Sequence, residues 1–90
     1  MNIDTALTYF TNAFEQLVKY YGSGNLNHPL AGETLKNIAL VNLRQLKYID
    51  ADENFKRAAE IFECNYGSHH KKVIEVKQRL EDVRKKIYKR

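Results

Sequence analysis

The sequence has little that would build a disulfide-rich or metal-binding protein. Its 90 residues include one cysteine, one proline, four glycines and no tryptophan. A single thiol, Cys64, cannot form a disulfide framework, so a reducing compartment fits best. No glycine elbow or obvious base accompanies Cys64, and we interpret it as an unreactive thiol packed in a helix. The adjacent His69 and His70 have no Cys, Asp or Glu at ligand spacing, so we expect no metal site.

Long apolar runs are also missing. No stretch of 18 apolar residues is present, and the first ten residues lack the basic-then-apolar pattern of a signal peptide. We therefore predict a cytoplasmic protein without a membrane span. Paired carboxylates, a phosphate-binding loop and a catalytic triad are absent from the sequence too. We therefore expect no enzymatic activity, no cofactor and no small-molecule substrate.

The residues that are present favour helices. Leu, Ala, Glu, Lys and Arg are abundant, and apolar residues recur at spacings of three and four. We predict an all-α fold in one domain, 1–90, with four antiparallel helices at about 2–21, 29–46, 49–66 and 70–88. Pro29 suits the start of the second helix because its missing N–H would be unpaired there anyway. The apolar set of this helix includes Leu30 and Leu46.

The sequence contains an internal repeat. Phe10, Ala13, Tyr21 and Gly22 correspond to Phe55, Ala58, Tyr66 and Gly67 at a shift of 45 residues. His28 and Ala31 correspond to His70 and Val73 at a shift of 42 residues. The difference lies in the loop after Gly22, where repeats tolerate insertions. If each repeat consists of a first helix A and a second helix B, the chain contains a lone helix B, a full A–B pair and a final helix A. This makes about two repeats.

The second and third predicted helices carry large and small residues in a fixed order: Leu35, Ile38, Ala39, Tyr48, Ala51, Phe55 and Ala58. This order resembles the tetratricopeptide repeat. The passage HPLAGETLKNIALVNLRQLKYIDADENFKRAAEIFECNYG, 28–67, is similar to the 42-residue variant of kinesin light chains and nephrocystin-like proteins. Residues 6–22 match the back half of a repeat, and residues 70–83 weakly match a front half. The resemblance implies a helix-turn-helix array in which small residues let the helices approach closely.

Several positions depart from this family pattern. Asn42 stands where Tyr is usual, Leu46 where Gly is usual, and Ala59 replaces a common Leu. Lys77 and Glu81 occupy packing positions of the last helix. A helix with charges at these positions cannot be buried between two neighbours, so we interpret it as a polar terminal cap.

The resemblance implies partner binding in a concave groove that the A helices line. On the second predicted helix, five residues project away from the packed side: Glu33, Lys36, Asn37, Leu40 and Arg44. Asn37 matches a position that often holds a peptide backbone, and Lys36 matches one that often meets an acidic group. An amide both donates and accepts, which suits an extended main chain. The alternative is that these are plain solvated residues.

The first predicted helix is apolar on more than one side, and no helix A precedes it in the sequence. Large exposed apolar patches are uncommon on soluble proteins. We therefore predict that a protein partner or a second copy docks on Phe10, Phe14, Leu17 and Tyr21. The other options are that the chain is a fragment of a longer array, or that the four helices close into a bundle and bury this face.

The positive charge is concentrated near the end of the chain. Residues 1–70 hold six Lys/Arg and eight Asp/Glu, a balance of −2, whereas residues 71–90 hold nine and three, a balance of +6. The densest part is a basic patch of Arg84, Lys85, Lys86, Lys89 and Arg90. We predict a non-enzymatic protein–protein interaction module that acts as an adaptor or as a subunit of a larger assembly. The alternative is a basic helical domain that binds nucleic acid or another polyanion through residues 71–90.

Overall fold

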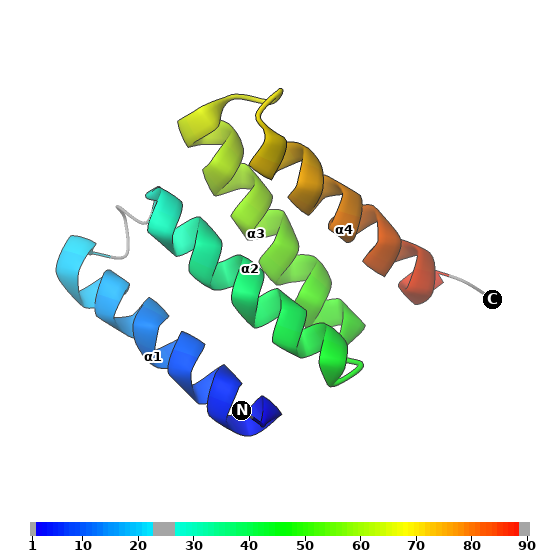
Figure 1. The fold of residues 1–90 in the computed structure, drawn as a ribbon, viewed down its shortest axis with the longest axis horizontal. Coiled ribbons are helices and arrows are strands. Elements are labelled where there is room, and N and C mark those ends of the chain that lie inside the picture. Colours follow the sequence, from blue (N-terminus) through cyan, green and yellow to red (C-terminus); the bar gives the residue numbers. More distant parts are fainter. Residues whose placement is uncertain (1, 23–26, 89–90) are drawn as a thin grey trace.

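The structure confirms the all-α fold class. The computed structural model describes residues 2–22 and 27–88. Within these ranges the chain forms four helices: α1 (Ile3–Tyr21), α2 (Pro29–Arg44), α3 (Tyr48–Tyr66) and α4 (Lys71–Tyr88) (Figure 1). Their ends differ from the predicted ends by at most two residues. Gly22 and Gly67 follow α1 and α3 with positive φ angles of 80° and 88°, a conformation that glycine adopts without a Cβ clash.

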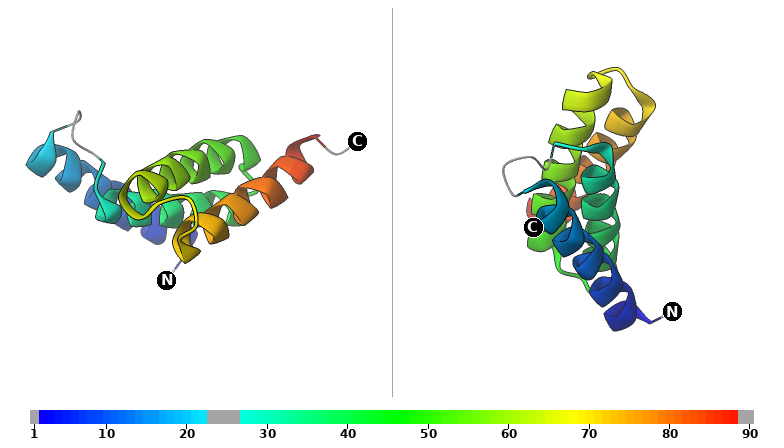
Figure 2. Two further views of the ribbon diagram at one scale, coloured as in Figure 1. Left: turned by 90° about the horizontal axis from the view of Figure 1, so that it is seen from above. Right: turned by 90° about the vertical axis from the view of Figure 1, so that its left-hand side faces the viewer.

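The four helices form an open, repeat-like array. Consecutive helices lie side by side and run in opposite directions, with α1 and α4 at opposite ends (Figure 1). Contact is most extensive between α2 and α3, then between α3 and α4, and smallest between α1 and α2. Seen from above, α3 lies to one side of α2 and α4 (Figure 2). The described part measures 42 × 33 × 21 Å, which is flatter than a closed bundle of four helices.

The seam between α2 and α3 is lined by small residues, as the sequence predicted. Ala39, Ala51 and Ala58 have no exposed surface, and this allows the two helix backbones to approach closely. The large side chains of Leu35 and Phe55 fill the space beside them and are 2% and 0% exposed. This seam is the centre of the hydrophobic core.

Helix α4 covers the other side of α3 with one narrow apolar stripe. The buried residues of α4 are Val73, Val76, Leu80 and Val83. The remaining surface of this helix is mostly polar. Lys77 is exposed and its Nζ lies 2.6 Å from Glu63 Oε2 of α3, and Glu81 is exposed as well. The two charged residues therefore lie outside the core, as the polar-cap interpretation requires.

Three residues differ from their sequence interpretation. Leu30 and Leu46 are 52% and 70% exposed and do not belong to the core. Leu30 is five positions before Leu35, about 140° around the helix from it. Leu46 lies beyond the end of α2 with a φ of 61°, so it no longer follows the helical stripe. Cys64 is exposed and not packed, and the Nδ2 of Asn27 donates a hydrogen bond to its Sγ at 2.8 Å.

Candidate partner-binding surface

The predicted groove residues share one side of α2. Glu33, Lys36, Asn37 and Leu40 are half-buried, and Arg44 is exposed. Their spacings of three and four residues place them along a single stripe. A hollow borders this stripe toward α1, and a second hollow borders it toward α4.

The α1–α2 hollow has a volume of about 320 Å³. Its main lining residues are Ile3, Ala6 and Phe10 of α1 with Asn37, Leu40 and Arg44 of α2. The walls are apolar, while the Asn37 amide and the Arg44 guanidinium supply polar groups. Such a combination suits an apolar side chain whose neighbouring main-chain or acidic groups meet the amide and the guanidinium.

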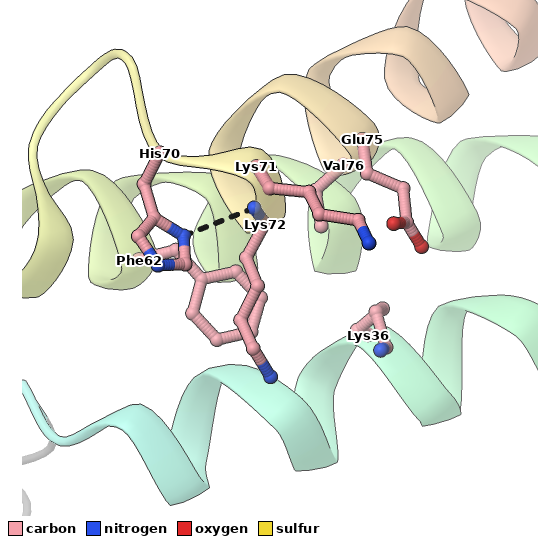
Figure 3. A pocket seen from close by; sticks show the side chains of 7 residues that line it. All are labelled: Lys36, Phe62, His70, Lys71, Lys72, Glu75 and Val76. Carbon is pink, nitrogen blue, oxygen red and sulfur yellow. Dashed lines mark hydrogen bonds between the residues drawn. The ribbon is translucent and has the colours of Figure 1, made fainter.

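The α2–α4 hollow has a volume of about 270 Å³ and a different character. Phe62 of α3 and Val76 of α4 form its apolar part, and Lys36, His70 and Lys72 contribute nitrogen atoms (Figure 3). The Nζ of Lys72 lies 5.8 Å from the centre of the Phe62 ring. This distance is within the range of a cation–π contact.

Two lysines of the α2–α4 hollow, Lys36 and Lys72, share one carboxylate. Glu33 pairs with Lys36 at 3.0 Å and also contacts Lys72 of α4. Partial burial acts to raise the pKa of Glu33, but hydrogen bonds and positive charge from Lys72 and Lys36 outweigh it and lower the pKa. The hydrogen bond to Glu33 in turn raises the pKa of Lys72. Glu33 therefore links α2 to α4 and neutralises part of the positive charge of the hollow.

The docking residues predicted on α1 are more covered than the sequence suggested. Leu17 is only 8% exposed, and Phe14 packs against the core with the Arg57 guanidinium 5.5 Å from the centre of its ring. Phe10 is half-buried in the α1–α2 hollow, and Tyr21 is 40% exposed. Packing against α2 and the core therefore removes Leu17 from any docking surface and covers part of Phe14.

The most exposed aromatic side chains of α1 are Tyr9 and Tyr20, at 62% and 85% exposure. Neither Tyr9 nor Tyr20 was predicted from the sequence as a docking residue. Both tyrosines lie away from the Leu7–Phe14–Leu17 side of the helix. Their position outside the main apolar stripe of the sequence could have indicated that they are exposed.

The basic patch is divided among several local contacts. Arg84 Nε lies 2.9 Å from Asp52 Oδ2, and the hydrogen bond to Asp52 raises the pKa of Arg84. Lys85 Nζ lies 4.0 Å from Glu81 Oε1, and Lys86 Nζ lies 5.9 Å from the Tyr48 ring centre. The remaining two residues of the patch, 89 and 90, lie outside the described residues. Each described member of the patch thus has its own contact, and two of the three face an acidic group.

Comparison with known proteins adds no family to these observations. No family model matches the chain, and no curated protein or solved structure matches it. None of the four described helices combines the length and apolar character needed to cross a membrane. Within residues 2–22 and 27–88, no group of three His, Cys, Asp or Glu side chains is placed to hold a metal ion.

Proposed function

We propose that the chain is a protein–protein interaction module that holds a segment of a partner protein against α2. The supporting observation is the α1–α2 hollow. There Asn37, Leu40 and Arg44 meet Phe10, which was predicted from a separate feature of the sequence. Three of the predicted groove residues and one predicted docking residue of α1 thus line one concave surface.

The chemistry of this hollow indicates the kind of segment it would take. Ile3, Phe10 and Leu40 offer an apolar surface for one apolar side chain. The Asn37 amide can donate to and accept from an extended main chain. Arg44 is exposed and forms no ion pair with any acidic side chain in the described ranges, so it is free to bind a carboxylate. The preferred ligand is an apolar residue with an acidic neighbour.

The resemblance to tetratricopeptide repeats supports partner binding on α2, although not this hollow in particular. Repeats of that kind bind partners in the groove lined by their A helices; α2 corresponds to a helix A, whereas α1 corresponds to a helix B. An adaptor, or a subunit of a larger cytoplasmic assembly, is the biological role that fits such a module. A second copy of the chain is one possible partner, because Tyr9 and Tyr20 leave part of α1 open.

A peptide-library selection tests this function without a known partner. We expect selected peptides to bind the wild-type chain, and the double variant Asn37→Ala/Arg44→Ala to bind at least tenfold more weakly. Arg79→Ala is the matched control, because Arg79 is an exposed arginine on α4 far from the hollow. Selected peptides whose affinity is unchanged in the double variant would refute the proposed site.

The salt dependence of binding distinguishes this proposal from its alternative. A polyanion that binds through residues 71–90 releases counterions, so its affinity falls steeply as salt rises. Binding in the α1–α2 hollow combines apolar contacts with a single charge pair at Arg44, so its affinity falls much less over the same range. A steep salt slope that Arg84→Ala/Lys85→Ala abolishes would favour polyanion binding. Measurement of the solution mass tests self-association separately.

A further inference from the structure

The α2–α3 turn carries two aliphatic side chains that the fold does not cover. Leu46 in the turn is 70% exposed, and Ile49 in the first turn of α3 is 67% exposed. The end of α4 lies at the same end of the array as this turn (Figure 1). An open hollow of about 480 Å³ lies between these segments, and its apolar lining residues are Leu46, Tyr48, Ile49 and Ile87. We call Leu46, Ile49 and this hollow the apolar tip.

Folding does not account for a leucine at position 46. Leu46 has a φ of 61°, in the left-handed region where glycine is unstrained and a residue with a Cβ atom is not. Its side chain is mostly exposed, so packing offsets little of this strain. Its N–H donates a hydrogen bond to the carbonyl oxygen of Leu43 at 3.0 Å, which a glycine would form equally well. A strained residue that adds no stability indicates that its side chain serves an interaction outside the chain.

The charge around the apolar tip is mainly positive. Lys47 lies in the turn beside Leu46, and the Nζ of Lys86 lies 5.9 Å from the centre of the Tyr48 ring. Neither lysine forms an ion pair with an acidic side chain of residues 2–22 and 27–88. Among the lining residues that the structure describes, Asp50 is the one carboxylate. In the sequence, residues 84–90 contain five Lys/Arg and no Asp/Glu. The tip thus combines exposed aliphatic groups with cations.

We infer that the apolar tip docks on the surface of an anionic lipid bilayer. Leu46 and Ile49 enter the boundary between headgroups and acyl chains, while Lys47 and Lys86 keep their ammonium groups among the lipid phosphates. An anionic leaflet attracts cations near its surface, so the charge of the tip is complementary to it. A fluid interface also takes up protruding aliphatic side chains without a cavity of matching shape, which a protein partner would have to supply.

This inference goes beyond the proposed binding of a protein segment and uses a different surface. No residue that lines the apolar tip also lines the α1–α2 hollow. Substitutions in the tip therefore leave the residues of that hollow in place. Binding to lipid and binding to a selected peptide can thus be lost separately, and failure of one proposal is distinguishable from failure of the other.

Sedimentation of the full chain with lipid vesicles tests the charge contribution. The probes are phosphatidylcholine vesicles with and without about 30% phosphatidylserine. Each lysine near an anionic surface raises the affinity about fivefold, so two raise it about 25-fold. We expect the wild type to bind the phosphatidylserine vesicles and Lys47→Gln/Lys86→Gln to lose about 25-fold in affinity. Lys71→Gln is the matched control, because Lys71 is an exposed lysine at the other end of α4, and it should bind like the wild type.

A second pair of substitutions tests the aliphatic contribution. Leu46→Gly/Ile49→Ser should lower the affinity for the same vesicles by roughly tenfold or more, because less apolar surface leaves water. Leu46→Gly relieves backbone strain, so unfolding does not account for the loss, and urea unfolding of the variant checks this. Ile74→Ser is the matched control, because Ile74 is 58% exposed and lies about 20 Å along α4 from Ile87. It should bind like the wild type.

NMR with spin-labelled lipid in the vesicles supplies a measurement that needs no variant. The methyl signals of Leu46 and Ile49 should broaden more than those of Ile74. A wild-type chain that does not bind the phosphatidylserine vesicles would overturn the inference. So would binding that Leu46→Gly/Ile49→Ser leaves unchanged, because charge alone would then explain it. A wild-type dimer that the same variant disperses would assign the apolar tip to a second copy, and this result too would overturn the inference.

Discussion

Gly32 lies where α2 packs on α3, and an added methyl group has no room there. A Cβ atom on Gly32 would lie 2.8 Å from Cε1 and 3.0 Å from Cδ1 of Phe62, and 3.2 Å from Cγ2 of Ile61. Non-bonded carbon atoms normally lie about 3.5–4.0 Å apart. Phe62 is fully buried, and although its ring borders the α2–α4 hollow, moving into that space would require a different rotamer. Gly32→Ala must therefore separate the two helices or force the ring out of its rotamer.

Two opposing contributions determine the size of the effect. In an open helix, replacing Gly by Ala stabilises the protein by about 1 kcal/mol. Over-packing a core costs about 1–3 kcal/mol. The added carbon would overlap two atoms of a rigid ring by up to about 1 Å, which places the cost in the upper half of that range. We therefore expect Gly32→Ala to lower the free energy of unfolding by about 1 kcal/mol.

A double-mutant cycle measured by urea unfolding checks this reasoning. Phe62→Leu removes Cε1, the atom nearest to the new Cβ, and replaces the rigid ring with a smaller side chain, while the contact with Ile61 Cγ2 stays. In this background Gly32→Ala should be less destabilising than in the wild type, because the gain in helix propensity remains and the largest overlap is gone. The interaction energy between the two sites should be about 1–3 kcal/mol. A stabilising effect of Gly32→Ala in the wild-type background would show that α2 and α3 do not approach closely at this point.

Three further predictions concern single positions. Lysines lower the pKa of Glu33 below 4.5, so the stability that Glu33 contributes is present above pH 4.5 and is lost as the pH falls through its folded pKa. Glu33→Gln should therefore reduce the pH dependence of the free energy of unfolding, measured with urea between about pH 5 and 3. Leu46 has a φ of 61°, a strained conformation for a residue with a Cβ atom, so Leu46→Gly should raise the free energy of unfolding by about 1 kcal/mol and raise the melting temperature. A lower melting temperature would contradict this strain argument. Phe14→Glu should destabilise the fold by about 3 kcal/mol, since Phe14 packs on the core, whereas Tyr20→Glu should change stability by less than about 0.5 kcal/mol. Thermal melts compare these two variants, and light scattering shows which of them changes the solution mass.

The local pattern of the sequence predicted most of the fold. Spacings of three and four residues predicted all four helices, and the repeat resemblance implied the small residues of the α2–α3 seam. These features depend on residues that are close in sequence, so one stretch of chain carries the whole signal. Helical spacing also predicted that the five groove residues of α2 share one side of the helix, where they lie beside the two hollows.

The sequence could not show how much of each apolar side is covered. Phe10, Phe14 and Leu17 have equivalent positions in the apolar pattern of the first helix. In the structure Phe10 lines a hollow, Phe14 packs against the core, and Leu17 is buried. The difference depends on where α2 and the rest of the core lie relative to α1. Charge counts likewise predicted a basic patch, but Asp52 is 32 residues from Arg84 in sequence and pairs with it only after folding.

The chain's own pattern thus determined which segments become helices, in what order, and which small residues allow close packing. Only the tertiary structure decided which apolar residues remain open, which charges are paired, and that Ile87 of α4 lies beside the α2–α3 turn. The physical reason is distance along the chain. Helix formation is set by interactions within one or two turns, whereas coverage and pairing join residues that are brought together only when separate helices pack.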